Sequence, residues 1–239
     1  MHVKKSLVYL LPNPPIHSKV LIVSATTSAN GETIVRTDPC IFHPQGGGQR
    51  ADVGTIGGFR VLDAHKTSDG DVEIALESAA AGLVQGQFVD AKVDDDVRRS
   101  NAALHTAGHV LANVVEQRFP ALKATGGHHW KDEARVVFTG PLSVPIEQFV
   151  NIIQKDLAAA INADMLVAVL GDPHANREIK IGELASLPCG GVHLARTGQL
   201  SHILIRKVKL AGKELRISYD ASPVTLVDEE TGVVTTFAP

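Results

Sequence analysis

The sequence is poor in cysteine and aromatic residues, and it has no long apolar run. Two cysteines among 239 residues are too few for a disulfide framework. The apolar stretch near the start is broken at Pro12 and is too short for a signal peptide or a membrane span. These absences predict a cytoplasmic protein that does not enter a membrane. In that compartment a cysteine near a histidine is better explained as a metal ligand than as half of a disulfide.

An excess of charge of one sign is also lacking. The net charge is -3, and residues 1–93 carry 8 basic against 9 acidic side chains by count. No global field attracts this chain to nucleic acid, so any RNA contact is expected to be local. The length and the apolar content of 44% suffice for one large or two small domains. We expect two, residues 1–93 and residues 94–239.

Six short segments in residues 1–93 have the composition of β-strands. They are rich in β-branched residues and are separated by glycine, asparagine or aspartate. The segments are residues 20–25, 33–37, 53–56, 59–64, 72–76 and 88–93. Several short strands at this spacing predict a small β-barrel.

One loop inside this region departs from the strand pattern. Residues 42–50, the glycine loop, read Phe-His-Pro-Gln-Gly-Gly-Gly-Gln-Arg. A glycine run is usually a flexible connector, but it also lets a backbone approach a partner closely. The flanking His43, Gln49 and Arg50 are chemically unusual for a hairpin tip, and both interpretations stay open on composition alone.

The composition changes after Val93, where we place the domain boundary. The acidic residues 94–96 precede a helical pattern that ends at Phe119, and carboxylates there cap the first amides and complement the helix dipole. A second helix is predicted from Pro145 to about Ala163. A loop is predicted at residues 126–131, and strands at residues 134–139, 166–170, 202–210 and 214–219. The chain is therefore predicted to be α+β, with a small barrel followed by a two-layer α/β domain.

The first predicted helix carries two histidines one turn apart. His105 and His109 project from the same face with Cβ atoms about 6 Å apart, which lets two imidazoles share one metal ion. Cys189 and His193 repeat this spacing within Pro-Cys-Gly-Gly-Val-His. Together the four side chains form the ligand set of a zinc site.

Each pair alone has an ordinary explanation. Two histidines at this spacing are more often a helix surface or a packed pair, and a lone cysteine is more often a small apolar residue. The coincidence of both pairs favours zinc. Thr106 follows the first histidine, where a protease of the HExxH type needs glutamate, so peptide hydrolysis by that route is not expected. Two arrangements stay open, three ligands with a water or four ligands around an ion that shapes the pocket.

Three motifs resemble those of a known family. Residues 99–111, with His-Thr-Ala-Gly-His at their centre, resemble the HTAxH helix of the editing domain of alanyl-tRNA synthetase. Residues 189–193, followed by Arg-Thr-Gly-Gln at 196–199, resemble its CGGTH and TGE segments. Residues 42–54 are similar to its glycine-rich FYxxGGGQxxDxG motif. No aminoacylation or anticodon-reading portion accompanies them, so the chain resembles the freestanding alanyl-tRNA editing proteins, the AlaX family.

The resemblance implies zinc-dependent hydrolysis of the ester that joins a wrong amino acid to the end of alanine tRNA. The wrong amino acid is chiefly serine, with glycine as a second candidate, because a pocket for alanine rejects both poorly. It makes His105, His109, Cys189 and His193 the zinc ligands and the acceptor end of the tRNA the partner. A zinc-bound or otherwise positioned water would attack the ester, and no side chain is assigned as its base.

The resemblance also places the substrate beside the glycine loop. Gly46, Gly47, Gly48 and Gln49 are expected to cover the acceptor end. Candidates to recognise a serine hydroxyl are Thr106 and Thr125, although each is explained equally well as a packing or turn residue. Val192, Gln199 and Ser201 stand where the family has threonine, glutamate and glycine, and these departures bear on amino-acid specificity.

Basic residues gather in one later segment. Residues 196–216 hold six basic and one acidic side chain, a net of +5 by count. Such a run is usually a solvated strand face, but with an acceptor stem to bind it would give salt-dependent phosphate contacts. The expected tRNA contacts are Arg98, Arg99, Arg196, Arg206, Lys207 and Lys209. The acidic residues 228–230 should point elsewhere, and nothing in the sequence indicates an obligate protein partner.

Two other functions stay open at this point. Gly-Gly-Gln at residues 47–49 also occurs in release factors, which hydrolyse a different tRNA ester, but their surrounding sequence is missing and the four metal-type residues are left unexplained. The second alternative is a non-catalytic, zinc-stabilised RNA-binding module. Removing the metal separates the cases, because a structural site loses its fold and a catalytic site loses turnover.

Overall fold

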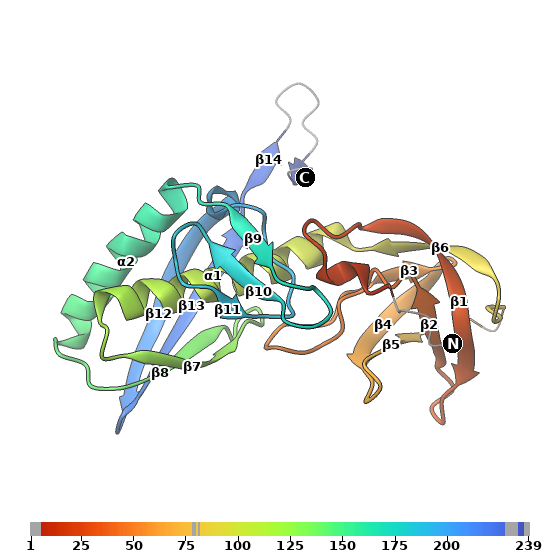
Figure 1. Cartoon of the computed structure of the whole chain (residues 1–239), viewed down its shortest axis with the longest axis horizontal. Helices are drawn as coiled ribbons and strands as arrows, with labels where there is room; N and C mark the ends of the chain where they lie inside the picture. Colours follow the sequence, from red (N-terminus) through yellow and green to blue (C-terminus); the bar gives the residue numbers. More distant parts are fainter. Residues whose placement is uncertain (1–5, 78–79, 81, 228–233, 237–239) are drawn as a thin grey trace.

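The computed structural model describes residues 6–77, 80, 82–227 and 234–236. Within them the structure is mostly β, with two α-helices. Figure 1 shows a β-barrel beside a part built from helices and sheets, with helix α1 running from one into the other. We call the second region the helix–sheet part. The predicted barrel is confirmed, whereas the division into two domains at residues 93 and 94 stays a prediction.

All six predicted strands form the barrel. They are β1 (His17–Thr27), β2 (Thr33–Asp38), β3 (Gly54–Ile56), β4 (Phe59–Lys66), β5 (Val72–Leu76) and β6 (Phe88–Val93). The barrel closes in the order β1-β2-β5-β4-β3-β6, and a short 3-10 helix, η1 (Val8–Leu10), precedes it. Alternate residues such as Val20, Ile22 and Ile74 are fully buried inside it. The glycine loop lies between β2 and β3.

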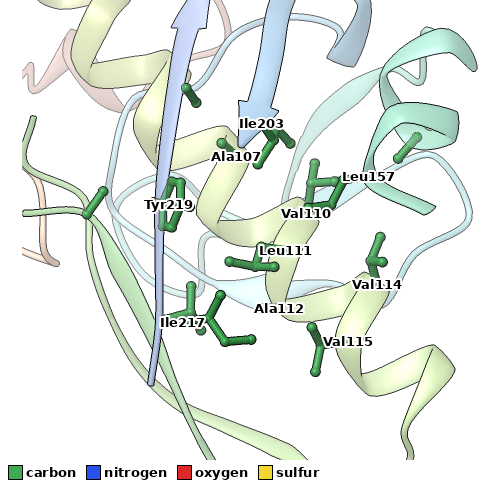
Figure 2. Close-up of a cluster of buried hydrophobic side chains, with 14 of the residues drawn as sticks. Ala107, Val110, Leu111, Ala112, Val114, Val115, Leu157, Ile203, Ile217 and Tyr219 are labelled. Carbon is green, nitrogen blue, oxygen red and sulfur yellow. The ribbon is translucent and has the colours of Figure 1, made fainter. Parts of the chain in front are cut away.

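Helix α1 (Asp95–Arg118) is the centre of the helix–sheet part. Its N-cap is Asp94, whose side chain accepts a hydrogen bond of 3.1 Å from the amide of Val97. The middle of the helix has no solvent-exposed face, because every residue from 101 to 115 is buried. Figure 2 shows the reason, since Leu111 and its neighbours are surrounded by side chains of a second helix and of the sheet, including Leu157 and Ile217.

A four-stranded antiparallel sheet carries the two helices on one side. Its order is β12 (Leu200–Ala211), β13 (Glu214–Pro223), β8 (Arg135–Thr139) and β7 (Lys123–His128), and α2 (Ile146–Asn162) and α1 pack against it. The loop predicted at residues 126–131 was wrong in its first half, because residues up to His128 pair with β8. Glycine has a low strand preference, so the neighbouring strand overrides the local composition here. Thr125 is the extra residue of a bulge in this pairing.

Smaller strands complete the structure. A three-stranded sheet consists of β9 (Val167–Leu170), β10 (Glu178–Ile181) and β11 (Leu187–Pro188), of which only the first was predicted. Beyond it lie a 3-10 helix, η2 (Thr197–Gln199), and a final pair, β14 (Thr225–Val227) with β15 (Val234–Thr236). The acidic residues 228–230 lie outside the described residues. None of the described helices is long and apolar enough to cross a membrane.

Candidate metal centre

The structure brings the four predicted metal-type residues together. His105 and His109 come from consecutive turns of α1, and Cys189 and His193 from the loop after β11. Their ligand atoms all lie within 4.8 Å of one another, and Cys189 Sγ is 3.4 Å from His105 Nε2 and 3.3 Å from His193 Nε2. Tetrahedral zinc with ordinary bond lengths would need a sulfur–nitrogen separation of about 3.5 Å. The four residues could therefore hold a single metal ion.

Burial sets the protonation of these ligands. It lowers the pKa of His109 to about 4 and lowers the pKa values of His105 and His193 well below the ordinary value, helped by the neighbouring histidines and by Arg177. The three imidazoles are therefore neutral at pH 7, with lone pairs to give to a metal. Burial raises the pKa of the Cys189 thiol, so a metal bound there must displace the thiol proton.

Gln49 of the glycine loop fixes the orientation of His105. The backbone N–H of Val192 donates to Gln49 Oε1 over 3.0 Å, and the same oxygen lies 2.8 Å from His105 Nδ1. Because Oε1 is an acceptor, His105 must donate through Nδ1, which leaves its Nε2 lone pair for a metal. Gln49 is fully buried, so it supports the metal centre rather than forming an exposed tip.

Thr106 supports the opposite ligand. Its Oγ1 accepts a hydrogen bond of 3.1 Å from the Leu194 amide and lies 3.2 Å from His193 Nδ1. Binding of a metal through Nε2 requires the proton on Nδ1, and the threonine oxygen is placed to accept it. Thr106 is completely buried. It therefore faces the back of His193, away from the position expected of a residue that recognises substrate.

The glycine loop ends in a tight turn pressed against β7. Gly46 and Gln49 exchange backbone hydrogen bonds of 3.1 and 2.9 Å, while Gly47 and Gly48 have φ values of 56° and 78°. Positive φ at both central positions defines a type I′ turn, which favours glycine. A Cβ on Gly48 would come within 2.6 Å of the Gly127 carbonyl oxygen, so a side chain there would push the turn off β7.

A buried ion pair joins the segment that follows the glycine loop to α1. Arg98 Nε and Nη2 donate to the two oxygens of Asp52 over 2.9 and 2.6 Å, and Nη2 also donates to the Ile41 carbonyl over 2.7 Å. Arg98 is 3% exposed and Asp52 is 0% exposed. Burial argues against the phosphate contact that we expected of Arg98. This role of Arg98 was not predicted, although Asp52 is the aspartate of the matched glycine-rich motif.

A second buried arginine, which was not predicted either, contacts the backbone of Cys189. Arg177 Nη1 donates to the carbonyl oxygen of Cys189 over 2.5 Å, and its Nε donates to the carbonyl of Leu10 over 2.9 Å. The loop that carries Cys189 is thereby connected to η1 beside the barrel. No motif in the sequence singles out this arginine.

The metal centre opens into a cavity of about 370 Å³. His105, His109 and Cys189 form part of its wall, together with Gly47 of the glycine loop and residues of β7 and β8. The remaining wall consists of His129, glycine backbone and apolar side chains. Such a cavity suits a small organic group with few polar contacts.

The other predicted contact residues lie away from this cavity. Thr125 is exposed on β7, where its hydroxyl donates to the Val137 carbonyl over 3.3 Å. Arg99 is half-buried in a second cavity of about 470 Å³ that also touches His193. Arg196 pairs with Asp164 over 2.7 Å. Arg206, Lys207 and Lys209 are exposed on β12, with Arg206 donating to the Asp132 carbonyl over 2.8 Å.

The departures from the family pattern leave the ligand atoms untouched. Val192 is buried and contributes its amide to Gln49. The Gln199 side-chain oxygen accepts from the Arg196 amide over 3.1 Å, and Ser201 is exposed beside Ser222.

The chain is similar in sequence to alanyl-tRNA editing proteins and to an alanine–tRNA ligase. No family model matches the chain. It is 31% identical over 225 residues to the alanyl-tRNA editing protein AlaX-M of Methanosarcina barkeri, covering 82% of this chain and 90% of the relative. It is 29% identical over 176 residues to AlaX-M of Pyrococcus horikoshii, covering 72% and 79%. It is 27% identical over 235 residues to the alanine–tRNA ligase of Parasynechococcus marenigrum, covering 88% of this chain and 26% of the ligase.

The fold and the site define a class of protein. Its members combine a β-barrel with a helix–sheet part that carries a His/Cys cluster beside a cavity. Within that class, the extent of the match to the Methanosarcina barkeri protein decides the family. The chain belongs to the AlaX family of alanyl-tRNA editing proteins.

Proposed function

We propose that this protein hydrolyses mischarged alanine tRNA, chiefly seryl-tRNA, with a zinc ion held by His105, His109, Cys189 and His193. The observation that carries the proposal is the placement of three of these ligands, His105, His109 and Cys189, in the wall of the 370 Å³ cavity, in a member of the AlaX family. A structural zinc site needs no cavity beside its ligands, so this placement favours a catalytic site over a non-catalytic RNA-binding module. The substrate places the protein in the cytoplasm.

The reaction breaks the ester bond between the amino-acid carbonyl carbon and the terminal ribose oxygen of the tRNA. Water supplies the hydroxyl of the released amino acid, and the ribose regains its hydroxyl proton. Zinc, when bound, would polarise the ester carbonyl or lower the pKa of a water. Gln49 and Thr106 hold the ligand imidazoles in place, and the glycine turn closes one side of the cavity. The ester is already activated, so positioning supplies much of the rate.

The exposed basic residues of β12 are the proposed contacts for the acceptor stem. Lys207 and Lys209 have exposed side chains on the strand that packs against α2, while the neighbouring Ile203 is buried in the core. Ammonium groups on a solvent-facing strand can reach phosphates without reading sequence. We propose Arg206 and Arg99 as additional contacts. The turn at Gly46–Gln49 would lie over the aminoacylated end.

The proposal is tested by incubating the purified protein with alanine tRNA that carries serine, glycine or alanine. Release of serine well above release of alanine is expected. His109→Ala should abolish release by removing a ligand, whereas His202→Ala, an exposed histidine on β12, should retain it. Equal release of all three amino acids, or release of none, would contradict the proposal.

A further inference from the structure

The cavity beside the metal centre is lined by a further histidine that the proposed chemistry does not use. His129 follows β7, lines the cavity and is 5% exposed. Its ring stacks on that of His105, with centroids 4.4 Å apart and an angle of 22° between the planes. Apart from the metal-type ligands, the cavity is lined by glycine, alanine, valine, leucine and proline. His129 is therefore the one polar side chain among the described lining residues that a metal would leave available to the substrate.

Glycines create the space for this ring. A Cβ on Gly108 of α1 would lie 2.4 Å from His129 Cε1, and a Cβ on Gly127 would lie 2.6 Å from Cε1 and Nε2. The position between α1 and β7 can hold an imidazole only because both neighbours lack side chains. The backbone N–H of His129 also donates to the Gly48 carbonyl over 2.8 Å, which ties it to the glycine loop.

A chain of two hydrogen bonds fixes which nitrogen of His129 carries the proton. The Tyr219 hydroxyl donates its only proton to the carbonyl of Leu104 over 2.7 Å. The same oxygen lies 2.7 Å from His129 Nδ1, so it must accept a proton from that nitrogen. Nε2 consequently has a free lone pair.

We infer that His129 is the specificity-determining residue of this site and that its Nε2 accepts a hydrogen bond from the side-chain hydroxyl of a seryl group. The inference rests on the proposed function and names the feature by which the site separates serine from alanine. A site built to pair with a hydroxyl disfavours an analogue that lacks it, because the buried acceptor is left without a partner. Glycine lacks the hydroxyl too, so seryl esters are the preferred substrate.

The two threonines expected to sense serine are less suited to that task. Thr106 Oγ1 is engaged by Leu194 and His193 at the back of the ligands. The Thr125 hydroxyl donates to the carbonyl of Val137. Neither is among the residues that line the cavity.

A matched pair of substitutions tests the inference. In His129→Asn the side-chain amide can still donate to Tyr219, but no acceptor remains at the position of Nε2. In His129→Gln the longer side chain can place its oxygen near that position. The ratio of kcat/KM for seryl- over alanyl-tRNA should fall about 10- to 100-fold in the asparagine variant. It should be partly retained in the glutamine variant, with Thr125→Val as the control that keeps the ratio.

Hydrolysis of glycyl-tRNA separates a specificity role from a general loss of activity. It should change little in His129→Asn, since glycine makes no use of the acceptor. An unchanged serine-to-alanine ratio in that variant, or a ratio lost in Thr125→Val instead, would overturn the inference. Wild-type protein that hydrolyses none of the three esters would overturn the proposed function itself.

A measurement on the unaltered protein covers the case in which the variants do not fold. The zinc-loaded protein, labelled with ¹⁵N-histidine, is titrated with non-hydrolysable amide analogues, 3′-seryl- and 3′-alanyl-amino-3′-deoxyadenosine. The seryl analogue should shift the His129 Nε2 resonance as a new hydrogen bond forms, and the alanyl analogue should not. Identical shifts with both analogues, or no shift with either, would overturn the inference.

Discussion

The barrel, with its glycine loop, and the helix–sheet part contribute to the metal centre in different ways. All four metal-type residues belong to the helix–sheet part, as does His129. The glycine loop of the barrel side contributes no ligand. It supplies Gln49, which orients His105, and Gly47, which closes part of the cavity. The helix–sheet part therefore supplies the side chains that could bind a metal and the substrate, and the glycine loop holds these side chains in position.

The largest expected effect comes from breaking the ion pair between the two regions. Arg98→Met leaves the fully buried Asp52 without its charge partner, so the free energy of unfolding should fall by about 3–5 kcal/mol. The control is Arg196→Met, which removes an exposed pair with Asp164 and should cost about 0–1 kcal/mol. Urea denaturation of both variants measures the difference. Similar losses in the two would show that the connection to Asp52 has no special role.

A smaller effect is expected when the glycine loop no longer orients a ligand. Gln49→Met keeps the volume but removes the acceptor for His105 and Val192, so zinc affinity should weaken about 10- to 100-fold. Gln45→Met changes an exposed glutamine of the same loop and should leave zinc affinity unchanged. Competition with a coloured chelator measures both. Unaltered affinity in the Gln49 variant would mean that the helix–sheet part holds its ligands unaided.

The two regions should also differ in their response to acid. Burial lowers the pKa of His43 in the glycine loop, and of His109 on α1, to about 4, against about 6.5 in an unfolded chain. Above about pH 6.5 both states are neutral and this stability is fully present. Between about pH 6.5 and 4 the unfolded chain takes up protons that the folded protein excludes, so stability is lost.

Thermal unfolding of the metal-free protein between pH 7.5 and 4.5 follows this loss. The melting temperature should fall with pH, and the fall should be shallower in His43→Gln. It should be shallower still when His105 and His109 are both replaced by glutamine, because the helix–sheet part holds more of the buried imidazoles. A wild-type melting temperature that does not change over this range would contradict the assignment of neutral buried histidines.

The smallest effect is expected on the surface. Replacing Lys207 and Lys209 with alanine should weaken tRNA binding modestly and reduce the slope of log K against log salt by about 2. Replacing Lys19 and Lys66, two exposed lysines on the barrel, should leave the slope unchanged. Filter binding at several salt concentrations measures both pairs. Equal changes of the slope in both pairs would mean that the barrel lysines contact the tRNA as much as those of β12 do.

A feature could be predicted from the sequence when the pattern that indicates it lies within one short segment of the chain. The six barrel strands and both helices were predicted, because their patterns are local. The ligand set was readable since each half has a fixed spacing on one segment. Strand β7 was mistaken for a loop over Gly126 and Gly127, where only the neighbouring strand reveals the pairing.

The contacts that hold the four metal-type residues in position could not be predicted in the same way. Asp52 and Arg98 are 46 residues apart, and no local pattern indicates that they meet. Gln49 was expected to cover substrate, because its motif reveals that the residue matters but not which atom it contacts. His129 was not predicted as a site residue, because the residues around it come from α1, β7 and β13, which are far apart in the sequence.

The central claim is that the four ligands hold a zinc ion that serves hydrolysis rather than folding. The direct test is the rate of seryl-tRNA hydrolysis by the purified protein before metal removal, after it, and after zinc is returned, with circular dichroism recorded at each step. The account predicts that hydrolysis is lost and then restored while the spectrum of the folded protein persists. Hydrolysis that continues without metal, or unfolding that accompanies metal removal, would contradict it.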